Sequence, residues 1–301
     1  MSYQRILFLV NPISGGKSKR NFQSLVLQNF DLKRFDFEIV YTEFAGHATE
    51  ILDRRKDIDE IVVAVGGDGT VNEIAGFLNG GSKPMSIIPL GSGNGLARHL
   101  GFSLQAKKAI QQLGQAKEIA IDSCTLNEHY FLSIAGIGFD SLIAKEFSQS
   151  TRRGFIGYAY VAVREFFKYK EQSYKLNIGG KVLHRKAALI TFANSNQFGY
   201  NTKISPESSL TDGLVDVCIL RKPKLYQVPC LLWKIWRNKA HKSSLLEIIR
   251  AKEIKLENNK FGYANVDGES LPAGEKINVR LHEKSLKIWI PIYGYGKEKR
   301  F

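Results

Sequence analysis

The stretch IVVAVGGDGTVNE, residues 61–73, decides the fold. Its first five residues are apolar and mostly β-branched, which is the composition of a buried strand. Three glycines then fall within four residues around Asp68. They free the backbone to turn with positive φ and to bring its N–H groups close to an anion. The spacing matches neither GxGxxG nor GxxxxGK[ST], so the stretch predicts a phosphate site of another kind, one that carries a carboxylate.

The pattern of a strand followed by a polar turn repeats through the first 122 residues. We expect strands at residues 5–10, 35–41, 60–65 and 85–90, and helices near 21–29, 48–55, 71–78 and 104–113. This alternation predicts a mostly parallel sheet with helices on its faces. Ligands of such sheets bind beyond the carboxyl ends of the strands. Asn11, Thr42, Gly66 and Ser92 each follow an expected strand, so they should gather at that edge.

The second half of the chain is rich in short strands. Segments 174–178, 181–185, 187–194, 214–220, 253–256, 277–282 and 286–290 show the pattern, and Gly179-Gly180 marks a hairpin. Helical insertions are expected near 158–167 and 228–236. Glycine-punctuated strands of this kind favour an antiparallel β-sandwich. The fold class predicted is therefore an N-terminal Rossmann-like α/β domain with a C-terminal β-sandwich domain.

Composition narrows the class of protein. The chain has 301 residues, 44% hydrophobic and 24% charged, which suits a globular protein of two domains. No apolar run approaches the roughly 18 residues of a membrane span. Cys124, Cys218 and Cys230 lie far apart without a CxxC pair, which favours reduced thiols over disulfides or a zinc site. We expect a cytoplasmic protein.

Charge points to a polyanionic partner. The net charge is +14 and the isoelectric point is about 9.6. Basic and aromatic side chains are mixed at residues 152–155, 167–170 and 233–237. Such mixing suits peripheral contact with an anionic membrane surface. Single-stranded nucleic acid and a solvated basic face without a partner are the alternatives.

Six further segments follow one another in a recognisable order. They are NPISGGK (11–17), Thr42 with GHA (46–48), PLGSGN (89–94), AGIGFD (135–140), DGLVDV (212–217) and DGE (267–269). Together with GGDGT they resemble the diacylglycerol kinase-type lipid kinases, a family with bacterial members that is similar to sphingosine kinases, NAD kinases and, more distantly, phosphofructokinases. Ser92 stands where threonine is usual and Ser133 where asparagine is frequent. Gly95 gives a GSGNG form closer to the sphingoid-base kinases, which leaves the acceptor lipid open.

The resemblance implies an ATP-dependent kinase with a defined domain plan. It implies a phosphofructokinase-like nucleotide-binding domain at 1–122, to which segment 286–301 returns, and a β-sandwich lipid-substrate domain at 123–285. The implied ATP contacts are Asn11, Thr42, Gly66, Gly67, Asp68, Gly69, Thr70, Val71, Asn72 and Ser92.

Carboxylates are the expected catalytic groups, because phosphoryl transfer needs a metal ion and an acceptor hydroxyl relieved of its proton. On a regular strand Asp267 and Glu269 would share one face. With Asp68 they would form an acidic site for Mg²⁺ and a general base. By resemblance we assign Glu269 as the proton acceptor, assisted by Asp267; the alternative is a plain Asp-Gly hairpin turn.

A second Mg²⁺ site is implied by resemblance alone. Its ligands would be the Asp212 carboxylate and the carbonyl oxygens of Ser209 and Leu214, a mixed oxygen set that suits a hard cation. The alternative is a type I turn.

The function expected is phosphorylation of a hydroxyl on a diacylglycerol-like or sphingoid lipid at a membrane surface. The partners would be the lipid substrate and the anionic membrane, with no nucleic acid; the oligomeric state stays open, a homodimer included. One alternative is NAD kinase-like phosphorylation of a soluble hydroxyl, which the shared GGDGT turn motivates. The other is a non-enzymatic nucleotide- or nucleic-acid-binding module, which explains the charge but gives Asp267 and Glu269 no role.

Overall fold

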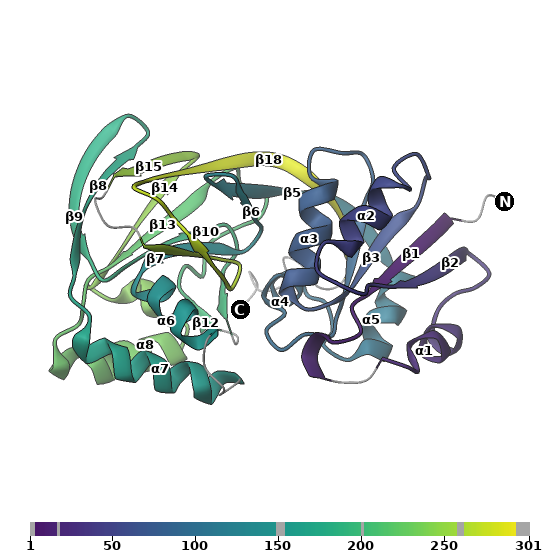
Figure 1. The fold of residues 1–301 in the computed structure, drawn as a ribbon, viewed down its shortest axis with the longest axis horizontal. Coiled ribbons are helices and arrows are strands. Elements are labelled where there is room, and N and C mark those ends of the chain that lie inside the picture. The colour runs from purple at the N-terminus through teal and green to yellow at the C-terminus, as the bar shows by residue number, and fades with distance from the viewer. Residues whose placement is uncertain (1–3, 17–18, 149–153, 200–201, 258–261, 293–301) are drawn as a thin grey trace. The chain divides into compact units, whose positions relative to one another are not determined.

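A computed structural model describes residues 4–16, 19–148, 154–199, 202–257 and 262–292. The chain forms two compact units, one made of residues 1–121 and 284–301 and the other of residues 122–283 (Figure 1). Strands β5 (Ala116–Leu126) and β18 (Lys276–Pro291) contain the two boundaries. The first unit is therefore built from both ends of the chain.

The first unit contains a parallel sheet. Its strands are β1 (Gln4–Val10), β2 (Phe35–Tyr41), β3 (Ile61–Gly66) and β4 (Met85–Pro89), in the order β2-β1-β3-β4, and β18 joins beside β4. All these pairs are parallel, and Ile288 of β18 pairs with Met85. Val10 pairs with both Tyr41 and Val65, so the carboxyl ends of three strands are level. The predicted α/β class is confirmed for this unit.

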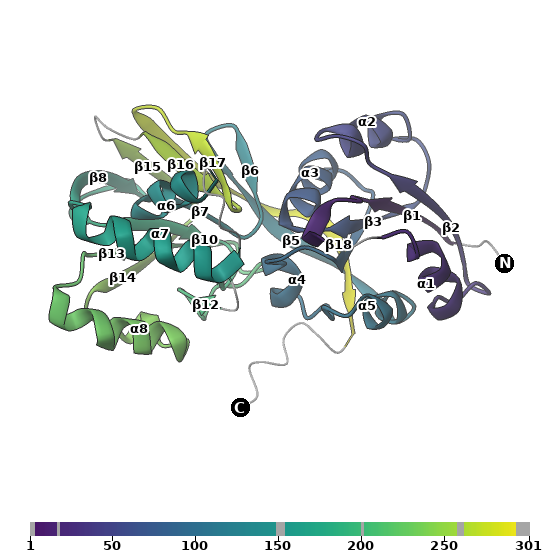
Figure 2. The ribbon, with the colours of Figure 1, turned by 60° about the horizontal axis from the view of Figure 1, so that its bottom comes forward.

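Helices cover both faces of this sheet. The helical segments of this unit are η1 (Ser14–Gly16), α1 (Phe22–Asn29), α2 (His47–Asp53), α3 (Asp68–Leu78), α4 (Gly95–His99) and α5 (Ala106–Leu113), of which α1, α2, α3 and α5 lie on the faces. Successive strand residues point to opposite faces. Accordingly Phe8 and Val63 pack with Val26 of α1 and Ile110 of α5 in one buried cluster. Helices α2 and α3 contact each other and lie on the other face (Figures 1 and 2).

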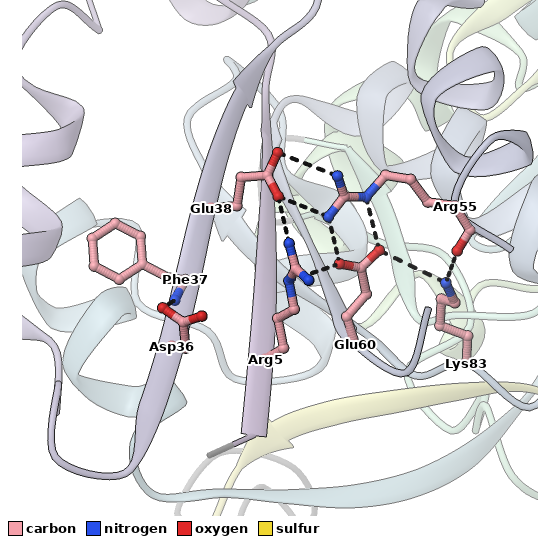
Figure 3. A network of polar contacts seen from close by, with 7 residues as sticks. All are labelled: Arg5, Asp36, Phe37, Glu38, Arg55, Glu60 and Lys83. Carbon is pink, nitrogen blue, oxygen red and sulfur yellow. Dashed lines mark hydrogen bonds and ion pairs between the residues drawn. The ribbon is translucent and has the colours of Figure 1, made fainter. Parts of the chain in front are cut away.

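A charged cluster stabilises this unit near the beginning of β1 and β3. The side chain of Glu60 is fully buried and accepts hydrogen bonds from Arg55 at 2.8 and 3.1 Å. Arg5 and Lys83 lie 3.8 Å from it, and Glu38 pairs with both arginines (Figure 3). Several donors are needed here because a buried carboxylate without partners is costly.

The second unit is a β-sandwich. One sheet has the order β14-β13-β10-β7-β16-β17, and the other joins β18, β15, β8 and β9 with β5 and β6. The bounds are β6 (His129–Phe131), β7 (Ile134–Gly138), β8 (Gln172–Ile178), β9 (Lys181–Ala187), β10 (Leu189–Ala193), β13 (Val215–Leu220), β14 (Leu246–Ala251), β15 (Glu253–Glu257), β16 (Tyr263–Val266) and β17 (Glu269–Pro272). A short separate pair is β11 (Gln197–Gly199) with β12 (Thr202–Lys203). Leu176 and Ile277 of one sheet and Phe192 and Val217 of the other share one buried core, which confirms the predicted sandwich.

Helical segments of this unit include α6 (Phe139–Ser148), α7 (Gly154–Lys168), η2 (Leu225–Gln227), α8 (Val228–Trp236) and η3 (Ala240–Lys242). Phe139 of α6 and Ile235 of α8 pack against the outer face of the six-stranded sheet, where Leu189 and Cys218 lie. Among the described residues, no helix has the length and apolar character of a membrane span.

Several elements were not predicted from the sequence, among them α4, α6, β7, β14 and β16. Helix α6 was not expected, because residues 135–140 were interpreted only as the AGIGFD motif. The expected strands at 277–282 and 286–290 are one continuous strand, β18, in which Lys284 has a φ of +48°. The polar residues between the two halves indicate a turn in the sequence, whereas in the structure the strand changes its pairing partner there, from β15 to β4.

Candidate functional site

Three glycine-rich loops gather at the carboxyl edge of the parallel sheet in the first unit. Loop 11–16 follows β1 and loop 90–94 follows β4; the third loop, 66–70, consists of the last residue of β3, Gly67 and the first residues of α3. Backbone hydrogen bonds tie them together: Asn11 donates to the Val65 carbonyl at 3.0 Å, and Leu90 donates to that of Gly66 at 2.7 Å. Thr42, at the end of β2, donates its N–H to the carbonyl of Val10 at 2.9 Å. The four turns therefore share one edge.

The loops approach one another so closely that only glycine fits. A Cβ placed on Gly91 would lie 2.3 Å from the Cα of Gly67, and one on Gly15 would lie 2.1 Å from the carbonyl oxygen of Leu90. Contacts below 3.0 Å are not tolerated when the neighbour is backbone. These glycines are thus required for backbone-on-backbone packing, in addition to any access that they give to a ligand.

Asp68 joins two of the loops. It is the first residue of α3, and its two carboxylate oxygens accept the N–H groups of Gly95 at 2.7 Å and Asn94 at 2.8 Å. Burial raises the pKa of Asp68, and these two hydrogen bonds oppose the rise. The carboxylate predicted for phosphate and metal chemistry therefore also fixes the start of α4.

The other residues predicted for ATP lie around this junction. The Asn11 side chain donates to the Thr70 hydroxyl at 3.1 Å. Thr42, Thr70 and Val71 are buried, whereas Gly69 and Ser92 are exposed. Asn72 is half-buried in the second turn of α3, an 11-residue helix whose first N–H groups and dipole favour an anion at its N-terminal end. The structure brings all ten predicted residues to the four strand ends of this edge.

Sequence reasoning assigned no role to two residues that hold the loops. Asn94 adopts a φ of +55°, accepts the Gly91 N–H at 2.9 Å and returns a bond to the Gly91 carbonyl at 2.8 Å. Lys19 is 6% exposed and donates to the carbonyls of Pro12 and Ser14. Removal of water by burial lowers the pKa of Lys19. The signal for Asn94 was its place in PLGSGN. Lys19 stands between Lys17 and Arg20 in a basic stretch, and nothing in the sequence distinguishes it from them.

The predicted pair Asp267 and Glu269 belongs to the second unit. Asp267 and Gly268, with φ of +46° and +96°, form the two-residue turn between β16 and β17, and Val266 pairs with Glu269 across it. The pair therefore lies in a hairpin turn and not along one face of a strand, because positive φ at both positions is what such a turn requires.

The two carboxylates have different surroundings. Asp267 accepts three backbone N–H groups, from Leu132 at 2.8 Å and from Ser133 and Ile134 at 2.9 Å each. Such charge-assisted bonds fix the Asp267 side chain. Glu269 is exposed. Of the two, Glu269 is the group that is open to solvent and to a substrate.

The loop predicted to bind a second Mg²⁺ is also in the second unit. Asp212 is exposed, and its Oδ1 accepts the Leu214 N–H at 3.2 Å. The pKa of Asp212 is raised by burial first and by the nearby carboxylates of Asp216 and Asp122. Asp122 anchors the loop by accepting the Gly213 N–H at 2.8 Å. Ser209 lies in the same loop.

The donor set of this loop fits a hard cation in type, because it offers oxygen atoms only and an acidic environment. Among the described residues, no group of three His, Cys, Asp or Glu side chains is placed to hold a metal ion. A cation here would need carbonyl oxygens and water to complete its coordination.

Comparison with known families agrees with this geometry. The family described as the diacylglycerol kinase catalytic domain matches residues 5–126, and the YegS C-terminal NAD kinase beta sandwich-like domain matches residues 133–288. The chain belongs to the diacylglycerol kinase family of lipid kinases. Family membership makes it a phosphotransferase, and the two matches cover the α/β part and the sandwich part in turn.

Curated relatives of this lipid kinase span nearly the same length. A diacylglycerol kinase from Bacillus subtilis is 26% identical over 288 residues, covering 93% of this chain and 95% of the relative. A diacylglycerol kinase from Staphylococcus carnosus is 25% identical, covering 96% and 95%. A probable lipid kinase YegS-like protein from Yersinia enterocolitica is 26% identical, covering 77% and 79%.

Solved structures share the fold of the kinase. A Bacillus anthracis diacylglycerol kinase superposes with a TM-score of 0.71 at 19% identity, covering 96% of this chain and 97% of that one. Another Bacillus anthracis structure assigned to the same class gives a TM-score of 0.79 at 21% identity, covering 98% and 99%. The predicted fold class is thus confirmed by comparison as well as by the strand topology.

Proposed function

We propose that the protein transfers the γ-phosphoryl group of ATP to a hydroxyl of a diacylglycerol-like or sphingoid lipid at a membrane surface. The observation that carries the proposal is the junction of the three glycine loops at the start of α3. There, exposed backbone and the N-terminal N–H groups of an 11-residue helix meet, which is an arrangement that suits phosphate.

Residues of the first unit would hold the triphosphate. Gly66 to Thr70 and Ser92 would contact the phosphates, and Asn11, through its bond to Thr70, would fix the shape of the turn. Asp68 keeps loops 66–70 and 90–94 in register through Asn94 and Gly95. Mg²⁺ bound with ATP would neutralise charge on the transferred group.

A carboxylate of the second unit would act on the acceptor. We propose that Glu269 takes the proton of the lipid hydroxyl, because it is exposed and because a general base must reach the proton that it removes. Asp267, with both carboxylate oxygens bound to backbone N–H groups, would position the hairpin that carries Glu269. Asp212, Ser209 and Leu214 would hold a structural Mg²⁺ that stiffens their loop.

The position of Gly95 bears on the identity of the acceptor. Gly95 donates its N–H to Asp68 at 2.7 Å, so its position is set by the loop junction. A family member with an acidic side chain at this position would place a further negative charge next to Asp68. Glycine in place of this acidic residue favours an acceptor that differs from diacylglycerol, and the sphingoid lipids are the first acceptors to test.

The test is a phosphorylation assay. The protein is incubated with labelled ATP, Mg²⁺ and mixed micelles of diacylglycerol, monoacylglycerol, sphingoid base or ceramide, and lipid products are separated and identified by mass. Phosphorylated lipid from at least one acceptor is expected. NAD is included as a soluble acceptor, and formation of NADP without any lipid product would favour the NAD kinase-like alternative.

Two variants assign the chemistry. Glu269→Gln should lower the rate at least about 100-fold, the lower bound for loss of a general base. Glu275→Gln, an exposed carboxylate in the same unit, is the matched control and should keep the parent rate. A folded parent that phosphorylates no lipid of the panel would refute the proposed activity.

A further inference from the structure

Helix α8 of the second unit packs on the protein with only one side. Leu231 is 7% exposed, and Ile235, four residues later, contacts the buried cluster that contains Ala240 and Leu246. Positions four apart lie on one helix face. The helix is thus anchored through Leu231 and Ile235, and it lies at the periphery of its unit (Figures 1 and 2).

The opposite side of α8 is apolar and exposed. Leu232 is 58% exposed, Trp233 54% and Trp236 75%, and the preceding turn η2 adds Leu225 at 68% and Tyr226 at 73%. We call these five side chains the α8 face. A helix that is apolar on both sides is unusual at a protein surface, because the outer side normally carries polar residues.

The α8 face is large by the standard of soluble proteins. A full aromatic side chain has on the order of 150–250 Å² of surface, so three exposed rings and two leucines present several hundred Å². The largest apolar patch of an ordinary monomer is about 300–600 Å², and patches at or above this size mark interaction sites. The size of the α8 face therefore indicates that it binds a partner.

The charges around the face identify the chemistry of that partner. From Arg221 to Ser244 the chain has seven Lys or Arg residues and no Asp or Glu. Lys224 precedes the face, and Arg237 and Lys239 follow it, all three exposed. Tryptophan and tyrosine rings flanked by basic side chains are the composition of a segment that lies in the headgroup layer of an anionic bilayer.

We propose that the α8 face is the surface through which the protein docks on an anionic membrane. The rings and leucines enter the interface, and Lys224, Arg237 and Lys239 remain at the phosphate level. The proposal builds on the proposed function, because a lipid kinase must meet an acceptor that is held in a bilayer. It adds the element that makes the contact.

Binding is measured without reference to turnover. The chain has three tryptophans, of which Trp289 lies in β18 of the first unit. In the variant Trp289→Phe the intrinsic fluorescence comes from Trp233 and Trp236 alone. Vesicles with about one third phosphatidylglycerol should shift this emission to the blue, and brominated acyl chains should quench it. Pure phosphatidylcholine vesicles should give a much weaker response, since the charge attraction is missing.

Variants locate the contact by vesicle co-sedimentation. Trp233→Ser with Trp236→Ser should lower partitioning at least tenfold. Leu27→Ser with Leu32→Ser, two exposed apolar residues of the first unit, is the matched control and should bind like the parent. Replacing Lys224, Arg237 and Lys239 by Gln should weaken binding about fivefold for each charge removed, the equivalent of about 1 kcal/mol. Lys33→Gln, Lys107→Gln and Lys108→Gln, equally exposed, give the charge control.

An activity arm separates this inference from the proposed function. With acceptor in vesicles the tryptophan variant should lose most of its rate, whereas with a short-chain acceptor dispersed as monomers it should match the parent. If no acceptor is phosphorylated, the kinase proposal fails while the binding result still decides the role of α8. Equal vesicle binding by parent and tryptophan variant would overturn the inference. Two other results would also overturn it. In the first, the parent does not bind vesicles but forms dimers that the tryptophan substitutions abolish. In the second, the parent does not bind vesicles but binds single-stranded nucleic acid, and the same substitutions abolish that binding.

Discussion

Substituting Gly91 by alanine tests the idea that the proposed phosphate site depends on two backbones in direct contact. The new Cβ would lie 2.3 Å from the Cα of Gly67 and 2.8 Å from the side-chain oxygen of Asn94. Carbon atoms pack at about 3.5–4.0 Å, so loops 66–70 and 90–94 would have to separate by more than about 1 Å. Neither neighbour is the end of a flexible side chain, because Asn94 is held by two hydrogen bonds to Gly91 itself.

The expected cost is about 3 kcal/mol in the free energy of unfolding, the upper part of the range for overpacking. A displacement of about 1 Å at a reacting group costs about 100-fold in rate, so kcat should fall by at least that factor. Urea unfolding followed by circular dichroism gives the first number. Initial rates at saturating ATP give the second.

Alanine substitutions at two other glycines of the same unit serve as comparisons for Gly91→Ala. A Cβ on Gly67 would meet the Cα of Gly91 at 3.2 Å, so Gly67→Ala should lie between parent and Gly91→Ala. Gly114 has a φ of −65°, and its nearest neighbour would be 3.6 Å away. Gly114→Ala should therefore be neutral or stabilising by about 0.5 kcal/mol. If Gly91→Ala unfolds like Gly114→Ala and keeps the parent rate, the close packing of the loops has no functional weight.

The remaining predictions concern carboxylates. Burial raises the pKa of Asp68 above 3.8, so its contribution to stability is full below that pH and is lost as the pH rises through the folded value. The unfolding free energy of the parent relative to Asp68→Asn should therefore decrease as the pH is raised above 3.8 in urea titrations, and an increase would contradict this sign. Glu60→Gln removes the charge of the fully buried partner of Arg55 and should lower the free energy of unfolding by about 3 kcal/mol. The KM for ATP should not change. A shift in KM would show that the charged cluster affects the candidate site. Asp267→Asn leaves backbone N–H donors facing an amide group, so it should lower the free energy of unfolding by about 2 kcal/mol in thermal or urea unfolding. Glu269→Gln is at an exposed position and should stay within about 0.5 kcal/mol of the parent. Equal stability of these two variants would mean that the Asp267 hydrogen bonds do not position the hairpin.

Local pattern accounts for what the sequence predicted well. Strand β3 lies at 61–66 because an apolar β-branched run is bounded by glycines, and α8 spans 228–236, where aromatic and aliphatic residues recur with helical spacing after a proline. The Gly179-Gly180 hairpin follows from positive φ at both residues, with Ile178 paired to Lys181. In each case the information lies within a few residues of the element.

Long-range contacts account for what the sequence did not predict. The N–H groups that hold Asp267 come from Leu132, Ser133 and Ile134, more than 130 positions away, and no periodicity reports such a pairing. The same holds for Asp68, whose partners Asn94 and Gly95 belong to the next loop along the sheet edge. The sequence identified Asp68 and Asp267 as candidate site residues. Their hydrogen-bond donors could not be identified in this way, because the fold brings those donors close from distant parts of the sequence.

Strand β18 has a consequence for how the protein is made. Its residue Ile288 supplies the strand beside β4, so the sheet of the first unit stays one strand short until residues 122–283 have been synthesised. The first unit is therefore completed only after the second unit, which is nested within it in the sequence, has been synthesised. A fragment that ends before residue 284 would retain the glycine loops yet leave the flank of β4 open, and expression of the first 121 residues alone should give an aggregation-prone sheet edge rather than an independent ATP-binding domain.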